Sequence, residues 1–157
     1  MIFCIKQKAF SFGDKFTVYD HQGRELYYVK GEVFSFGKKL HLYDLNQTEI
    51  AFIQQKVFSF LPKYHVIMDG IKAAEVVKSF TFFRSEYTVP NLGWKVYGDF
   101  FNHEYQIYDG ARQIAAVSKQ WYTWGDTYHI ETDSDYNSLL LLAICLVVDA
   151  CLESNSN

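Results

Sequence analysis

The chain has 157 residues, 49% hydrophobic and 18% aromatic, which suits one folded domain with a sizeable core. This composition excludes a disordered protein, and a formal net charge of −3 gives no overall case for a nucleic-acid partner. All 15 Lys and Arg residues lie within residues 1–119. The three cysteines (Cys4, Cys145 and Cys151) cannot all pair, and their spacing suggests no zinc site. Because the first residues do not read as a signal peptide, we expect a reduced, cytoplasmic setting.

A sequence block recurs along residues 1–132, most clearly as Lys8–Asp20, Glu32–Asp44 and Lys56–Asp69. The six copies are anchored on aromatic residues spaced 24, 24, 22, 20 and 21 residues apart, namely Phe10, Phe34, Phe58, Phe80, Phe100 and Trp121. A fixed repeat period means that each copy is one supersecondary unit. The repeat therefore predicts the architecture but says little about chemistry.

Within each copy, apolar and polar residues alternate after a first turn, as expected of a half-buried strand. The first apolar position of this pattern is occupied by Phe16, Leu40, Tyr64, Tyr87, Tyr105 and Tyr128. A second turn and a longer extended segment complete each copy, so we expect twelve strands in meander order. All first turns then lie on one rim of the sheet and all second turns on the other. We expect bends near Lys30-Gly31, Gln54-Gln55 and Ser118-Lys119, because the longer segments exceed the usual strand length.

The last segment differs from the repeats. Asp135 to Ser138 is a helix-capping signal, followed by ten uninterrupted apolar residues, Leu139 to Val148. Ten residues are too few to span a bilayer, so we expect a buried helix over residues 136–152. A closed sheet of twelve strands is wider than its own side chains can fill. We therefore predict a mainly β protein, a twelve-stranded up-and-down antiparallel barrel closed around this C-terminal helix. The alternative, a β-trefoil, has no cavity for such a helix.

This arrangement, with its Phe-Ser-Phe and Val-Tyr-Asp cadence and Leu-rich end, resembles the tubby C-terminal-like superfamily and, within it, the LURP-one-related (LOR) family. The resemblance covers nearly the whole chain and implies one tubby-like domain over residues 1–157, without enzymatic activity. Tubby proteins bind phosphoinositides, and the superfamily is distantly similar to phospholipid scramblases, so the resemblance implies phospholipid binding. The basic lipid-contacting positions of tubby proteins do not match this sequence one by one, and none is carried over.

Several residue patterns invite a catalytic or metal-binding interpretation. His41, His65 and His129 share one repeat position, but the alternation places them on the outer face and on separated strands. The acidic stretch from Asp126 to Asp135 lacks the spacing of a calcium loop. Nucleophile-elbow, dinucleotide and phosphate-loop motifs are absent, so we expect no catalytic residue, metal or cofactor.

The first rim is the best candidate for a binding site. Four successive first turns carry the bases Lys15, Lys38, Lys39, Lys63 and Arg84. Clustered bases attract anionic headgroups, and Phe36, Phe60 and Phe83 beside these turns can enter a membrane interface. We therefore predict binding to anionic phospholipid, with a peripheral location at the membrane. The alternatives are a protein-interaction scaffold or regulatory protein without a small ligand, and an undetected hydrolase.

Overall fold

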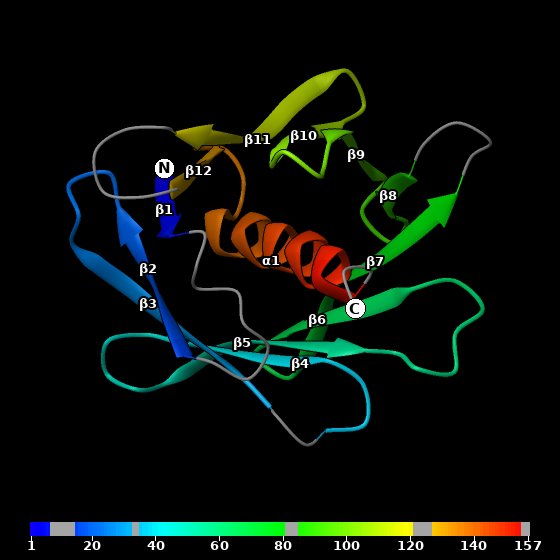
Figure 1. The fold of residues 1–157 in the computed structure, drawn as a ribbon, viewed down its shortest axis with the longest axis horizontal. Helices are drawn as coiled ribbons and strands as arrows, with labels where there is room; N and C mark the ends of the chain where they lie inside the picture. Colours follow the sequence, from blue (N-terminus) through cyan, green and yellow to red (C-terminus); the bar gives the residue numbers. More distant parts are fainter. Residues whose placement is uncertain (7–14, 33–34, 81–84, 121–126, 155–157) are drawn as a thin grey trace.

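The structure is a computed structural model that describes residues 1–6, 15–32, 35–80, 85–120 and 127–154. Its twelve strands and single helix follow the chain in simple order (Figure 1). The elements are β1 (Ile2–Lys6), β2 (Lys15–Asp20), β3 (Glu25–Gly31), β4 (Lys39–Tyr43), β5 (Glu49–Gln55), β6 (Lys63–Met68), β7 (Ile71–Phe80), β8 (Ser85–Val89), β9 (Trp94–Asp99), β10 (Glu104–Asp109), β11 (Arg112–Gln120), β12 (Thr127–Thr132) and α1 (Ser138–Ser154).

Each strand pairs antiparallel with the next, and β1 pairs with β12 to close the barrel. The closing seam runs in unbroken register from Ile2 opposite Glu131 to Lys6 opposite Thr127. The seam between β1 and β2 is short, with Phe3 opposite Asp20 and Cys4 opposite Tyr19 among the described residues. The predicted up-and-down barrel is confirmed.

The alternating pattern sends one face of every strand inward. All six residues at the first apolar repeat position are buried, including Tyr64, Tyr87, Tyr105 and Tyr128, which are at most 1% exposed. The long segments expected to bend behave in two ways: β3 and β5 end at Gly31 and Gln55, whereas β11 continues to Gln120 and stays in register with β12 through Ser118 and Lys119. The register shifts fall instead near the second turns, for example between Val18 and Tyr19 of β2, where the chain prepares to reverse.

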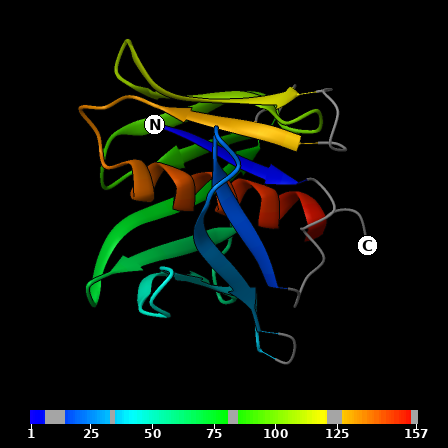
Figure 2. The same cartoon turned by 90° about the vertical axis from the view of Figure 1, so that its left-hand side faces the viewer.

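The helix fills the barrel (Figures 1 and 2). Every residue from Leu141 to Val148 is fully buried, as its apolar surface on all sides requires. Asn137 caps the first turn, its Oδ1 accepting a hydrogen bond of 3.1 Å from the Leu140 amide. Figure 2 shows α1 running between the two ends of the barrel, from the end where β12 finishes. The helix therefore plugs the barrel, as predicted, and its C-terminal end lies toward the first rim.

Candidate functional site: the first rim

The first rim is the end of the barrel at which the odd-numbered strands β1 to β11 end and the even-numbered strands β2 to β12 begin. Among the described residues, five phenylalanines at this rim are exposed, with relative accessibilities of 63–102%: Phe36, Phe58, Phe60, Phe80 and Phe101. The large exposed apolar residues of the opposite rim are Met1, Leu45 and Ile71, which are all aliphatic. Single exposed apolar residues are ordinary, but aromatic residues gathered at one end mark an interaction surface.

The β5–β6 turn projects its aromatic residues because both of its ends are tied down. The Lys56 amide donates to the Lys63 carbonyl at 2.8 Å, which closes the turn, and the Pro62 carbonyl accepts from the Lys78 amide at 2.8 Å. Phe58 and Phe60 lie between these anchors and are almost fully exposed, at 95% and 102%. They cannot fold inward because α1 already occupies the interior.

A groove of about 1030 Å³ lies beside this turn, over the outer faces of β4 to β7. Its wall combines the aromatic rings of Phe36, Phe58 and Phe60 with the ammonium groups of Lys39, Lys56 and Lys63. The rings of Phe36 and Phe58 lie 5.8 Å apart and join the β3–β4 and β5–β6 turns into one apolar patch. The groove therefore offers an apolar surface and cationic groups side by side.

The bases predicted from the sequence have different surroundings. Lys38 donates from Nζ to the Ala150 carbonyl near the end of α1. Lys39 pairs with Glu32 at 3.4 Å, and Lys63 lies 3.7 Å from Glu75. Lys15 lies over the ring of Tyr28 at 5.1 Å, and Arg84 falls outside the described residues, as does Phe83.

Lys38 contacts the helix for a clear electrostatic reason. The last turn of α1 contains no basic residue of its own, although its free carbonyls carry partial negative charge. Lys38 supplies the missing cation from the barrel wall. Its backbone is held independently, because the Lys38 amide donates to Gln55 Oε1 at 2.9 Å and its carbonyl accepts from the Gln55 amide at 2.8 Å.

Glu75 lines the groove and lies close to three basic side chains, those of Lys63, His65 and Lys72. His65 Nε2 lies 3.0 Å from Glu75 Oε2, and Lys72 Nζ lies 3.5 Å from the same oxygen. Partial burial opposes ionisation of Glu75, but the His65 hydrogen bond and the charges of Lys63 and Lys72 outweigh it, so its pKa is lowered. The pKa of His65 is lowered by burial, with the charges of Lys72 and Lys56 acting in the same direction. At neutral pH the positive charge of the groove therefore comes from its lysines.

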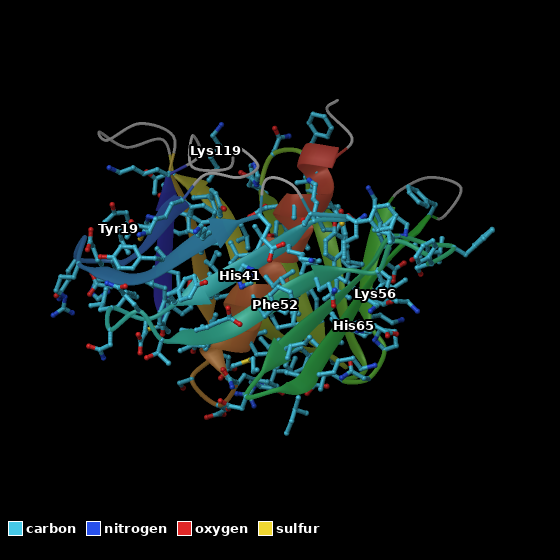
Figure 3. The ribbon with its side chains drawn as sticks, turned by 90° about the horizontal axis from the view of Figure 1, so that it is seen from below. Tyr19, His41, Phe52, Lys56, His65 and Lys119 are labelled. Atoms are coloured by element: carbon cyan, nitrogen blue, oxygen red, sulfur yellow. The ribbon has the colours of Figure 1, made fainter. Side chains whose placement is uncertain are left out.

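Lys56 was not predicted as a site residue, although it differs from Lys39 and Lys63 in an informative way. It lies on the same side of the barrel as His65 (Figure 3), and no ion pair of Lys56 occurs within the part of the chain that the structure describes. The sequence prediction named the bases of four successive first turns, whereas Lys56 stands at the start of its repeat. Lys56, Phe58, Phe80 and Phe101 occupy ordinary repeat positions, so no local motif distinguished them.

Two of the outward-facing histidines, His41 and His65, contact carboxylates. His41 lies between two carboxylates, with Nδ1 2.6 Å from Glu49 and Nε2 2.8 Å from Glu32, and its ring stacks on Phe52 at 4.7 Å (Figure 3). Across the described ranges, no cluster of three or more His, Cys, Asp or Glu side chains could hold an ion.

The acidic residues near the second rim are also accounted for where they are described. The Arg112 guanidinium binds Asp133 at 2.7 Å and Asp135 at 2.6 Å. Asp126 lies outside the described residues. Asp133 and Asp135 are therefore part of an ion-pair network with Arg112 beside the connection between β12 and α1.

A second hollow, of about 540 Å³, lies on the outer wall beside β1, β2 and β12. Its lining includes Cys4, Lys6, Tyr19 and His129. Burial, and secondarily the charge of Asp20, raise the pKa of the Cys4 thiol, which disfavours the reactive thiolate. This hollow therefore has no activated nucleophile at Cys4.

Comparison with known proteins places the chain among relatives of the same architecture. A family model described as LURP-one-related (LOR) matches residues 1–149. The chain is 35% identical over 153 residues to the uncharacterised protein YxjI of Bacillus subtilis strain 168. The alignment covers 98% of this chain and 94% of that protein. An X-ray structure of a protein from Arabidopsis thaliana aligns with a TM-score of 0.67 over 96% of this chain and 90% of its own length. At 15% identity this last match shows a common fold.

Proposed function

The chain belongs to the LURP-one-related family, whose model matches residues 1–149, and we propose that it is a non-enzymatic protein that binds anionic phospholipid headgroups through its first rim. The observation that carries this proposal is the gathering of five exposed phenylalanines at that rim. Exposed phenylalanine rings can insert their apolar surface at the boundary between acyl chains and headgroups. The rim would then meet a membrane end-on.

The lysines of the groove give the rim its preference for negative charge. Each base near an anionic membrane surface contributes roughly 1 kcal/mol, and Lys39, Lys56 and Lys63 lie together beside the exposed rings. The ion pairs with Glu32 and Glu75 reduce this contribution for Lys39 and Lys63. Lys56 therefore carries the largest share of the expected electrostatic attraction.

The interior of the barrel supports a role without catalysis. Residues Leu141 to Val148 of α1 are fully buried there and occupy the space in which a substrate would bind. Burial, and secondarily the charge of Asp149, raise the pKa of the Cys145 thiol far above its usual range. In the described part of the chain, no helix is both long enough and apolar enough to cross a membrane.

Vesicle flotation tests the proposal. The protein should float with vesicles of phosphatidylcholine mixed with phosphatidylglycerol at low salt, and less with phosphatidylcholine alone or at 1 M salt. Replacing both Phe58 and Phe60 by Ser should abolish flotation, whereas the matched second-rim change of Leu45 and Ile71 to Ser should leave it unchanged.

Two results would overturn this assignment: no flotation with either vesicle type at low salt, or equal losses from the two double variants. The remaining candidate would then be a protein-interaction scaffold or regulatory protein without a small ligand.

A further inference from the structure

Asp149 is the one charged residue in the buried part of α1, and its side chain is 2% exposed. Its Oδ2 accepts a hydrogen bond of 2.8 Å from the Tyr128 hydroxyl of β12. Its Oδ1 lies 3.2 Å from His103 Nδ1, outside good hydrogen-bond geometry. Both of these atoms are buried, and neither has another hydrogen-bond partner among the described residues. A buried carboxylate in an apolar helix therefore faces one imidazole.

His103 is held in place by the turn that carries it. This β9–β10 turn places His103 in the left-handed region, with φ of 54°, and its amide donates to the Phe100 carbonyl at 3.2 Å. The His103 ring lies flat on Tyr128, with centroids 5.1 Å apart and planes 7° from parallel. The backbone conformation is uncommon for a residue other than glycine, so the inward-facing contacts must favour it.

The same turn carries one of the exposed phenylalanines of the first rim. Phe100 packs inward against Tyr87 and Tyr105, with ring centroids 4.8 and 5.4 Å apart. Phe101 points outward and is 85% exposed. The position of Phe101 therefore depends on how firmly Phe100 and His103 attach the turn to the barrel.

The groups around Asp149 are almost all neutral donors. From the elements packed against it, the titratable groups that face it are Tyr87 of β8, Tyr105 of β10, Tyr128 of β12, Cys145 of α1 and His103 of the turn. Burial, and then the Asp149 charge, raise the pKa of Tyr105 well above its usual range, so this phenol keeps its proton. The charges of Lys78 and Lys38 act on the neighbouring thiol of Cys151. Within the described chain, only the His103 ring lies within ion-pair distance of Asp149, at 3.2 Å.

We propose that Asp149 and His103 form a proton-dependent latch that holds the β9–β10 turn against the end of α1. The closed latch can exist as a carboxylate facing an imidazolium or as a neutral acid facing a neutral imidazole. Both forms contain one titratable proton, so the closed latch retains that proton. When it is lost, an unpaired carboxylate remains in the core, and such a charge is strongly disfavoured there. Rising pH should therefore open the turn, which hydrates Asp149 and releases Phe101 from its fixed position.

The size of the effect follows from proton linkage. Where the closed turn binds one proton and the open, hydrated turn binds none, the opening equilibrium changes roughly tenfold for each pH unit. The latch itself does not depend on lipid binding. If the first rim binds membranes as proposed above, the latch would also make the contribution of Phe101 depend on pH.

Hydrogen exchange between pH 6 and 9, corrected for the intrinsic rates, tests the latch without any lipid. In the native protein, amides of residues 99–105 and of the last turns of α1 should lose protection as pH rises. His103→Gln should remove this dependence, and Asp149→Asn should remove it too if that variant folds. The matched control, His129→Gln on the outer face of β12, should retain it.

Tyr128→Phe separates the latch from a purely structural role of Asp149. Losing the 2.8 Å hydrogen bond should lower protection at every pH while the dependence on pH persists. The latch is refuted if His103→Gln keeps the native pH dependence, or if native protection does not change between pH 6 and 9.

Discussion

Replacing Lys38 by Met should separate the structural bases of the first rim from those available to a ligand. Methionine keeps most of the side-chain length but cannot donate to the Ala150 carbonyl at the end of α1. The backbone of Lys38 stays anchored by its two hydrogen bonds to Gln55. The loss is therefore confined to the ammonium group.

The expected cost is that of a hydrogen bond to a charged donor. Such bonds contribute about 1.5–3 kcal/mol, which includes the favourable placement of a cation at a helix C-terminus. A partly exposed site calls for the lower half of that range, so we expect a loss of about 2 kcal/mol. For a domain of this size, that corresponds to a fall in Tm of roughly 4–8 °C.

Thermal unfolding of Lys38→Met beside Lys56→Met provides the assay, with vesicle flotation as a second readout. Lys56→Met should leave Tm nearly unchanged, because no ion pair of Lys56 is found in the described ranges, but it should weaken flotation. Lys38→Met should show the reverse. An unchanged Tm for Lys38→Met, or equal effects of the two variants on flotation, would refute the division of roles.

Three further predictions concern the fold. Leu146→Asp should yield insoluble protein, whereas Leu146→Ala should fold and lose about 2–5 kcal/mol in urea unfolding, because the residue is fully buried. Gly98→Ala should lower the free energy of unfolding by more than about 2 kcal/mol, because the new Cβ would lie 2.4 Å from backbone atoms of β10. Gly110→Ala places its Cβ in open space, so it should lower the free energy of unfolding by only about 1 kcal/mol. The pKa of Asp20 is lowered, first by the hydrogen bond from the Arg24 amide. The ionised Asp20 therefore stabilises the protein above the pKa that it has in the unfolded chain, and this stabilisation is lost as pH falls through its pKa in the folded protein. Asp20→Asn should therefore be less stable than the native protein at pH 7, and the difference in urea midpoints should shrink toward pH 3; a constant difference would contradict this.

The barrel and its plug could be predicted from the sequence because they depend on local periodicity. Alternation of apolar and polar residues identified the strand after each first turn, and the fully apolar segment after Asn137 identified a helix that needs complete burial. The register shifts could not be predicted, because they occur where a strand must match both its neighbours near a turn. Val18 and Tyr19 follow the ordinary repeat pattern, and only the pairing with β3 shows the shift.

The candidate site also combines features that the sequence predicts with contacts that depend on the tertiary structure. The sequence alone determined that the first turns share one end of the barrel, because a meander reverses direction at every turn. Tertiary structure alone decided that Lys38 contacts the helix end while Lys39 pairs with Glu32, because Ala150 and Glu32 reach this rim only through the docking of α1 and the pairing of β3 with β4. The contact between His103 and Asp149 likewise depends on where the helix stops inside the barrel, which no repeat period encodes.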